Sequence, residues 1–503
     1  MRSDNVIKSS FWKIFNNMLS ILLGFGSRTI FIHFLSADYL GINGLFTNVL
    51  SLLSLAELGF STAVTFNLYK PLIQKDEKKI AGIMNLYKWV YRVVAVFIAI
   101  AGLCVVPFLG YICKDSQFEL NYLRITYLLF LGKTVSTYFF SYNSTLITAD
   151  QKEYKILPIT SASTIVCNVF KILTLVVTRN FLVYLATDIL VGILFNAMTA
   201  YYVKKEYPLL RDKDAKLDKD ERKKIFSDVG NLFLGKLSTT ILTSTDNIII
   251  SSFVNVVSVG LMSNYTTLIG YVQTFINAPL YSAQASIGNA VAAEPKEYVY
   301  KILKRLTMMT FFVASFSATA LLCLSNDFIA IIWDNLILPM PVVVILMVNS
   351  FLQMIKQPLW ITLNTCGLFK KDKYISLAGA LCNLIVSLVL VQFWDISGVI
   401  WGTIISQLLQ MILKARLLFK DYFQESCVKY LLLICGCFAG LGIEMGVTYF
   451  LCSLVPGWHL YLVFVVKAII CTVVPTAMIV LIFRKTDAFD YTLSLIKHKL
   501  LKK

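Results

Sequence analysis

Long apolar segments recur along the whole chain, and they constrain the fold more than any other feature of the sequence. A helix that spans a lipid bilayer needs about 20 predominantly apolar residues. Such segments follow one another from near residue 11 to near residue 484, and the sequence is 57% hydrophobic and 15% charged. Soluble domains contain about 25% charged residues. The sequence therefore predicts an all-α integral membrane protein without a separate soluble domain. An outer-membrane barrel is excluded because its strands would alternate apolar and polar residues.

Charged breaks divide the apolar sequence into fourteen predicted transmembrane helices. The spans near 226–253 and 259–290 are rich in Ser, Thr and Asn, which suits helices that line a polar cavity. The predicted spans are residues 11–35, 41–68, 85–110, 122–147, 157–178, 182–203, 226–253, 259–290, 303–325, 341–366, 375–394, 397–419, 430–454 and 460–484. The connections between them are short, which leaves no room for a folded enzyme domain.

The net charge of +17 is concentrated on one side of the predicted membrane. If both termini are cytoplasmic, the termini and cytoplasmic connections hold 35 of the 46 Lys and Arg residues. The opposite side holds Lys114 and Arg179. Cytoplasmic loops of membrane proteins carry such an excess of basic residues. We therefore predict a multi-pass protein of the cell membrane with both termini in the cytoplasm, and a basic charge that serves orientation and not nucleic-acid binding.

Cysteine and histidine residues do not predict a metal site. The eleven cysteines are scattered through apolar stretches, and the three histidines are far apart. None of the cysteine spacings matches a zinc-binding motif. We interpret the cysteines as small buried hydrophobic residues, and we expect no metal and no cofactor.

A charged segment divides the chain into two predicted lobes. Residues 1–203 form an N-lobe of six spans, and residues 204–225 form a cytoplasmic linker. Residues 226–419 form a C-lobe of six further spans, and residues 420–503 add two helices and a basic cytoplasmic tail. A weak repeat at an offset of 219 residues aligns Phe34 with Phe253 and Gly41 with Gly260. An even number of spans per lobe makes the repeats parallel, related by a pseudo-twofold axis, with a central cavity between the lobes.

Several charged residues lie deep within predicted spans, where each costs about 2.5–3.5 kcal/mol on insertion scales. A water-filled cavity lined by cations would remove most of this cost and would attract an anion. The predicted substrate-binding cations are Arg28, Lys133, Lys171, Lys236 and Lys356. The predicted coupling or cavity acids are Glu57 and Asp246, and the polar cavity residues are Asn43, Asn247, Asn264, Gln273 and Asn277.

Each of these charges also has a structural interpretation. Glu57 could neutralise Arg28 between adjacent helices. Asp246 and Lys236 are nearly three helical turns apart, about 15 Å, so we do not expect them to pair, and Asp246 becomes a candidate for ion or proton coupling. Glu444 and Lys467 lie at similar depths in adjacent spans, and we expect them to form a structural pair. Asp188, near the outer end of the sixth span, is ambiguous.

The segment 28–92 resembles a known family of transporters. The resemblance rests on Arg28-Thr29, Tyr39-Leu40-Gly41, the sequence Ala56-Glu57-Leu58-Gly59, and Tyr69-Lys70-Pro71. These features are similar to those of bacterial polysaccharide flippases, the Wzx-type branch of the MATE-like MOP superfamily. The resemblance implies alternating access by two six-helix lobes, which would move an undecaprenyl-pyrophosphate-linked oligosaccharide from the cytoplasmic to the outer leaflet of the bacterial inner membrane. It also implies a polysaccharide polymerase or glycosyltransferases as partners.

The sequence leaves three alternatives to this reading. A drug/cation antiporter of the same superfamily should have an acidic cavity, which five deep cations disfavour. A lipid II flippase shares the predicted span number and a cationic cavity, and only the resemblance in 28–92 separates it. A membrane glycosyltransferase or polymerase would need a larger extramembrane segment. We therefore expect a transporter and not an enzyme, driven by an H⁺ or Na⁺ gradient or by the membrane potential.

Overall fold

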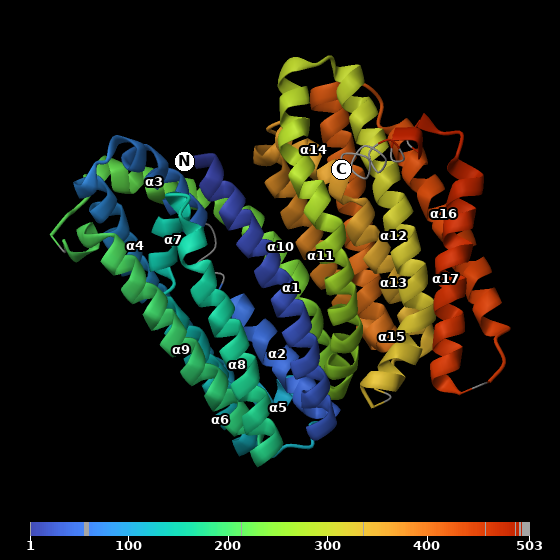
Figure 1. Cartoon of the computed structure of the whole chain (residues 1–503), viewed down its shortest axis with the longest axis horizontal. Helices are drawn as coiled ribbons and strands as arrows, with labels where there is room; N and C mark the ends of the chain where they lie inside the picture. The colour runs from blue at the N-terminus through green and yellow to red at the C-terminus, as the bar shows by residue number, and fades with distance from the viewer. Residues whose placement is uncertain are drawn as a thin grey trace. The chain divides into compact units, whose positions relative to one another are not determined.

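The computed structural model describes residues 2–54, 60–212, 214–334, 336–457, 459–487, 489–491 and 494. Every regular element within these residues is a helix (Figure 1), which confirms the predicted all-α class. By length and composition, eight of the described helices are long and apolar enough to cross a membrane. The chain divides into two compact units, residues 1–260 and 261–503.

Unit 1 is a bundle in which α8 packs between α1 and α9, while α10 packs along α2 and α3. Local sequence fixes the helix ends: Asp76 caps α4 by accepting from the Lys79 amide, and Asn180 caps α9 by accepting from the Leu182 amide. Its helices are α1 (Arg2–Phe34), α2 (Ala37–Leu53), α3 (Phe60–Gln74), α4 (Glu77–Val105), α5 (Leu109–Ile112), α6 (Leu120–Tyr138), α7 (Tyr142–Ala149), α8 (Leu157–Thr178), α9 (Phe181–Glu206), α10 (Lys219–Phe253) and the first turn of α11 (Val256–Ala293).

Unit 2 is built around α12, which packs against α13, α16 and α17. The two C-terminal helices therefore pack directly on the core of this unit. Besides the remainder of α11, its helices are α12 (Lys296–Ile332), α13 (Met340–Ile355), α14 (Gln357–Thr365), α15 (Phe369–Leu418), α16 (Val428–Ser453) and α17 (Leu460–Phe483).

The long element α15 consists of two helical halves joined by a tight reversal. Trp394 and Asp395 have non-helical backbone angles, and Asp395 has a φ of 47°, which non-glycine residues rarely adopt. The halves then contact each other, because Asn383 Nδ2 donates to Thr403 Oγ1 over 3.0 Å. This reversal falls between the predicted spans 375–394 and 397–419.

The other predicted spans also fall on observed helices. Three of them are interrupted. The span 85–110 runs from α4 through a 3₁₀ turn at Val106–Phe108 into α5, the span 122–147 is divided between α6 and α7, and the span 341–366 between α13 and α14. The span 41–68 begins in α2 and ends in α3, with residues 55–59 outside the description. The helices thus match the predicted intervals, whereas the number that crosses the membrane stays a prediction.

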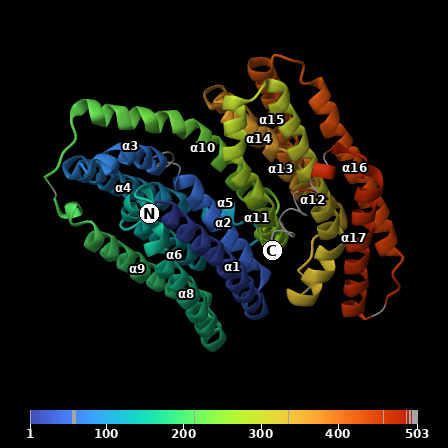
Figure 2. The ribbon, with the colours of Figure 1, turned by 45° about the horizontal axis from the view of Figure 1, so that its top comes forward.

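The charged segment 204–225 folds against the start of α4. It contains the end of α9, a short 3₁₀ turn at Pro208–Arg211 and the first turns of α10. Asn85 Nδ2 donates to the backbone oxygens of Asp212 and Ala215 over 2.9 and 3.1 Å. In Figure 2 this segment leaves α9 and reaches α10 beside α3 and α4. Helix α10, which we assigned to the C-lobe, therefore packs in unit 1, and the division into two six-helix lobes stays a prediction.

Two glycines aligned by the weak repeat meet each other inside unit 1. A Cβ atom added to Gly41 would lie 2.1 Å from the backbone oxygen of Val256. A Cβ atom added to Gly260 would lie 2.5 Å from the backbone oxygen of Ala37 and 3.0 Å from the Gly41 nitrogen. Only glycine permits this approach of the first turn of α11 to α2.

Gly260→Val is therefore expected to destabilise unit 1. The valine side chain would force two backbones apart, and overpacking of this kind costs about 1–3 kcal/mol. Gly270→Val on the same helix is the matched control, because a Cβ atom at Gly270 meets nothing within 4 Å. The measurement is the midpoint of thermal unfolding in detergent. Equal midpoints for the two variants would contradict the close approach.

Candidate functional site

Two of the predicted cations in unit 1 share one carboxylate. Lys133 Nζ on α6 lies 2.5 Å from Asp188 Oδ2, and Lys171 Nζ on α8 lies 3.4 Å from Asp188 Oδ1. The Cys167 thiol donates to the same Oδ1 over 3.0 Å. Lys171 Nζ also lies 4.7 Å from the centre of the Tyr184 ring, a cation–π distance. We call these five residues the α9 cluster.

Helical spacing explains why the α9 cluster forms. Cys167 and Lys171 are four residues apart on α8, and Tyr184 and Asp188 are four residues apart on α9. Residues at this spacing lie on one face of a helix. Because α8 and α9 are joined by Arg179 and Asn180 alone, they run antiparallel and bring these faces together. The cluster holds two ammonium groups and one carboxylate, so its formal charge is positive.

Unit 2 contains a second group in which two lysines lie near one carboxylate and one aromatic ring. Lys414 Nζ lies 2.8 Å from Asp372 Oδ1 and 4.3 Å from the centre of the Trp360 ring. Lys356 Nζ lies 5.5 Å from the same ring and donates to Gln407 Oε1 over 2.7 Å. We call Lys356, Trp360, Asp372, Gln407 and Lys414 the α15 cluster. It too holds two cations and one carboxylate.

Pro358 accounts for the position of Lys356. Proline lacks a backbone N–H and is tolerated in the first turn of a helix. Helix α13 accordingly ends at Ile355 and α14 begins at Gln357, with Lys356 at the junction. Lys356 and Trp360 are four residues apart, which places the ammonium group and the indole on one side of the junction.

The remaining predicted residues of unit 1 that the structure describes lie on α1, α2 and α10. Arg28 is partly buried on α1, and Asn43 is partly buried on α2. Asp246 and Asn247 are partly buried and adjacent on α10. Lys236 lies on α10, but its side chain is outside the described residues, as is the whole of Glu57.

Three predicted polar residues of unit 2 lie on α11. Asn264 is buried, and its Nδ2 donates to the backbone oxygen of Leu336 over 3.1 Å, which ties α11 to the loop after α12. Gln273 Nε2 donates to Gln353 Oε1 on α13 over 2.8 Å. The side-chain oxygen of Asn277, one turn further along, is buried without a hydrogen-bond partner among the described residues. A buried polar atom of this kind calls for water or a ligand.

The predicted pair of Glu444 with Lys467 is wrong. Lys467 Nζ lies 2.6 Å from Asp327 Oδ2 on α12, which packs against α17. Asp327 lies beyond the predicted end of span nine, outside the spans from which a partner for Lys467 was predicted. Glu444 is buried on α16.

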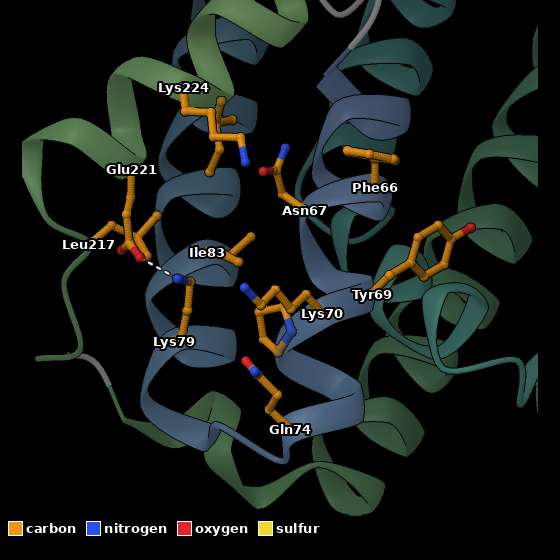
Figure 3. Close-up of a pocket in the computed structure, with 12 residues that line it drawn as sticks. Phe66, Asn67, Tyr69, Lys70, Gln74, Lys79, Ile83, Leu217, Glu221 and Lys224 are labelled. Carbon is orange, nitrogen blue, oxygen red and sulfur yellow. Dashed lines mark ion pairs between the residues drawn. The ribbon is translucent and has the colours of Figure 1, made fainter.

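Unit 1 also contains a cavity of about 530 Å³ between α3, α4 and the first turns of α10. Three lysines and one carboxylate line it: Lys70, Lys79, Lys224 and Glu221. Lys79 and Glu221 form an ion pair, drawn as a dashed line in Figure 3. Lys70 and Lys224 are exposed and have no such line in the figure. Lys70 belongs to the Tyr69-Lys70-Pro71 sequence on which the family resemblance partly rests. We call this cavity the α3 pocket.

Sequence reasoning left Asp188 ambiguous and missed Asp372 and Lys414 of the α15 cluster. Lys414, near the end of the predicted span 397–419, was not among the predicted cavity cations, yet its exposed fraction is 2%. Its partner Asp372 is 42 residues away in sequence. One sequence signal could have identified the α15 cluster: Lys356 and Trp360 are four residues apart, and Pro358 lies midway between them.

Comparisons with known proteins identify the fold. No protein-family model matches the sequence, and no curated protein matches it at a significant level. The inward closed structure of the lipid II flippase MurJ has a TM-score of 0.67 at 13% identity, over 95% of this chain and 99% of that chain. An inward-facing multidrug resistance MATE family transporter of the MOP superfamily has a TM-score of 0.62 at 13% identity, over 79% and 92% of the two chains.

A third similar structure is a MOP superfamily transporter from Pyrococcus furiosus. The polarity of its binding pocket is reversed, which suggests a different function for that protein. Its TM-score is 0.56 at 12% identity, over 82% of this chain and 94% of that chain. The chain thus has the fold of MATE and MurJ transporters, and its structural neighbours are transporters and flippases, not enzymes. With its apolar helices, it is a multi-pass membrane protein.

Proposed function

We propose that this chain is a flippase that moves an undecaprenyl-pyrophosphate-linked oligosaccharide from the cytoplasmic to the outer leaflet of the bacterial inner membrane, for the synthesis of a surface polysaccharide. It would work by alternating access and would not be an enzyme. Both termini would lie in the cytoplasm. A polysaccharide polymerase or glycosyltransferases would supply or consume the lipid-linked glycan.

The observation that carries this proposal is the surplus of cations inside both units. The α9 cluster and the α15 cluster each hold two lysines for one carboxylate. Charges within a membrane protein are costly and mark substrate or ion pathways. A cationic surplus favours a substrate with at least two negative charges, which a pyrophosphate group supplies.

Lipid II is the second candidate substrate. It is favoured by the likeness to MurJ, which extends over 95% of this chain. The resemblance of residues 28–92 to polysaccharide flippases favours the oligosaccharide. An exporter of organic cations is disfavoured because such a substrate would be repelled by the lysine surplus. The P. furiosus neighbour, whose pocket polarity is reversed, illustrates that charge varies with function in this fold.

The α3 pocket would receive the anionic head group at the cytoplasmic end of the helices. Lys224→Glu is expected to raise the substrate concentration for half-maximal flipping about threefold, since an exposed charge pair contributes about 0.2–1 kcal/mol. Lys223→Glu is the matched control, because the neighbouring Lys223 is exposed but does not line the pocket. Equal effects of the two variants would show that only the general surface charge matters.

Asp246 would couple transport to an ion gradient. Asp246→Asn keeps the size of the side chain and removes its charge, so it is expected to flatten the dependence of the flipping rate on pH or on sodium. The rate is measured in vesicles with imposed proton or sodium gradients, and the parent is measured in parallel under the same gradients. A variant that responds to both gradients as the parent does would make Asp246 a structural residue.

The direct test of the proposed function uses the full chain reconstituted into liposomes. The probe is an undecaprenyl-pyrophosphate oligosaccharide with a fluorescent label on its sugar, and flipping is followed by access to a membrane-impermeant quencher. Lipid II and an organic cation are tested in parallel vesicles. We expect the labelled oligosaccharide to be flipped fastest. Flipping of lipid II alone would establish the second candidate, and transport of the cation alone would establish an exporter.

A further inference from the structure

Three cysteines that are far apart in sequence converge inside unit 2. Cys323 lies on α12, Cys452 on α16 and Cys471 on α17, and their exposed fractions are 7%, 3% and 1%. The three sulfur atoms all lie within 4.8 Å of one another, and the Cys452 and Cys471 sulfurs are 3.9 Å apart. Ala320, Leu324 and Ile470 pack against them. The thiols therefore share a small space that excludes water.

The spacing of the sulfurs matches a metal site with three thiolate ligands. Three sulfurs bound at about 2.3 Å around one ion in a plane lie about 4.0 Å from one another. Among the residues that the structure describes, these three thiols are the group of potential metal ligands whose atoms all lie within 4.8 Å of one another. Zinc in structural sites prefers four ligands, whereas thiolates are the ligands that select copper(I).

An ion pair lies next to the three thiols. Lys467 precedes Cys471 by four residues on α17, and Asp327 follows Cys323 by four residues on α12. The two side chains form an ion pair 2.6 Å long, one helical turn from the thiols. This ion pair joins α12 to α17 and so helps to hold Cys323 and Cys471 side by side.

We propose that Cys323, Cys452 and Cys471 form a binding site for one copper(I) ion. Copper(I) enters in its reduced state, and protons from the thiols that bind it pass to the solvent, so the step changes no oxidation state. The bound ion would link α16 and α17 to α12 and would hold the two C-terminal helices on the core of unit 2. This site does not depend on the proposed transport function.

The experiment titrates the full chain in detergent with copper(I) under anaerobic, reducing conditions against a colorimetric copper(I) chelator. We expect one tightly held equivalent in the parent, and the loss of this equivalent in Cys323→Ser, Cys452→Ser and Cys471→Ser. Cys437→Ser is the matched control, because Cys437 is also buried on α16 but lies outside the cluster. It should retain the equivalent.

X-ray absorption on the copper-loaded parent keeps the test decisive if a serine variant fails to fold. Three sulfur neighbours at about 2.2–2.3 Å are expected. Two sulfur neighbours, or nitrogen and oxygen neighbours, would overturn the site. So would equal copper binding by the parent and Cys452→Ser. Peptide mapping that finds a Cys452–Cys471 disulfide in protein kept under argon would also overturn it, because the sulfurs would then be unavailable to the metal.

Discussion

Asp188→Asn is expected to lower the free energy of unfolding of unit 1 by about 3 kcal/mol. The substitution leaves the ammonium groups of Lys133 and Lys171 beside a neutral amide. Removing one partner of a buried pair costs about 3–5 kcal/mol, and the lower end applies because the Lys133 side chain is 43% exposed. The measurement is the unfolding midpoint in detergent together with the yield of monodisperse protein.

Asp115→Asn serves as the control for this prediction, because Asp115 is exposed in the segment after α5. It removes the same charge without affecting a paired cation. A midpoint for Asp188→Asn within error of the Asp115→Asn midpoint would contradict the α9 cluster as a source of stability.

A triple variant is expected to separate the contribution of the α9 cluster to stability from its contribution to flipping. The triple variant Lys133→Met, Lys171→Met, Asp188→Asn removes all three charges together. Replacing a buried ionic group by apolar side chains of similar size is often neutral or stabilising, so the triple variant should regain the midpoint that Asp188→Asn loses. Its flipping rate should nevertheless fall about 10- to 100-fold, since a hydrogen bond to a charged group contributes about 1.5–3 kcal/mol.

Cys167→Ala is the control for the triple variant. It touches the same carboxylate through its 3.0 Å contact with Asp188 but changes no formal charge, so its flipping rate should stay near that of the parent. A stable triple variant that flips the labelled oligosaccharide at the parental rate would show that the α9 cluster is a structural element only.

The helices could be predicted from the sequence because the length of an apolar run reflects the thickness of the bilayer. The intervals 157–178 and 430–454 fall almost residue for residue on α8 and α16. Even the reversal at Trp394 and Asp395 was located, since Asp395 interrupts the apolar run. The breaks at Phe139–Ser141 and at Lys356 were not predicted, because the residues around them remain apolar enough to continue a span.

The partners of the charged residues could not be predicted in the same way. The depth of Lys171 and Lys356 follows from counting residues along a span, but Asp188, Asp327 and Asp372 approach their lysines only through packing between helices. Lys467 illustrates the limit, since its partner Asp327 lies beyond the predicted end of span nine and the sequence does not contain the distance between the two side chains. The same limit concealed the three cysteines of unit 2, which are separated by as many as 148 residues.

The most direct test of the central claim locates the lipid-linked glycan in a strain that lacks this gene. Intact cells and opened inner-membrane vesicles are labelled with a sugar-specific reagent that does not cross membranes. A flippase predicts that the glycan accumulates on the cytoplasmic face while the surface polysaccharide is lost, and that the wild-type gene restores both. Normal surface polysaccharide with the lipid-linked glycan on the outer face, or a complete absence of the lipid-linked glycan, would contradict the proposed function.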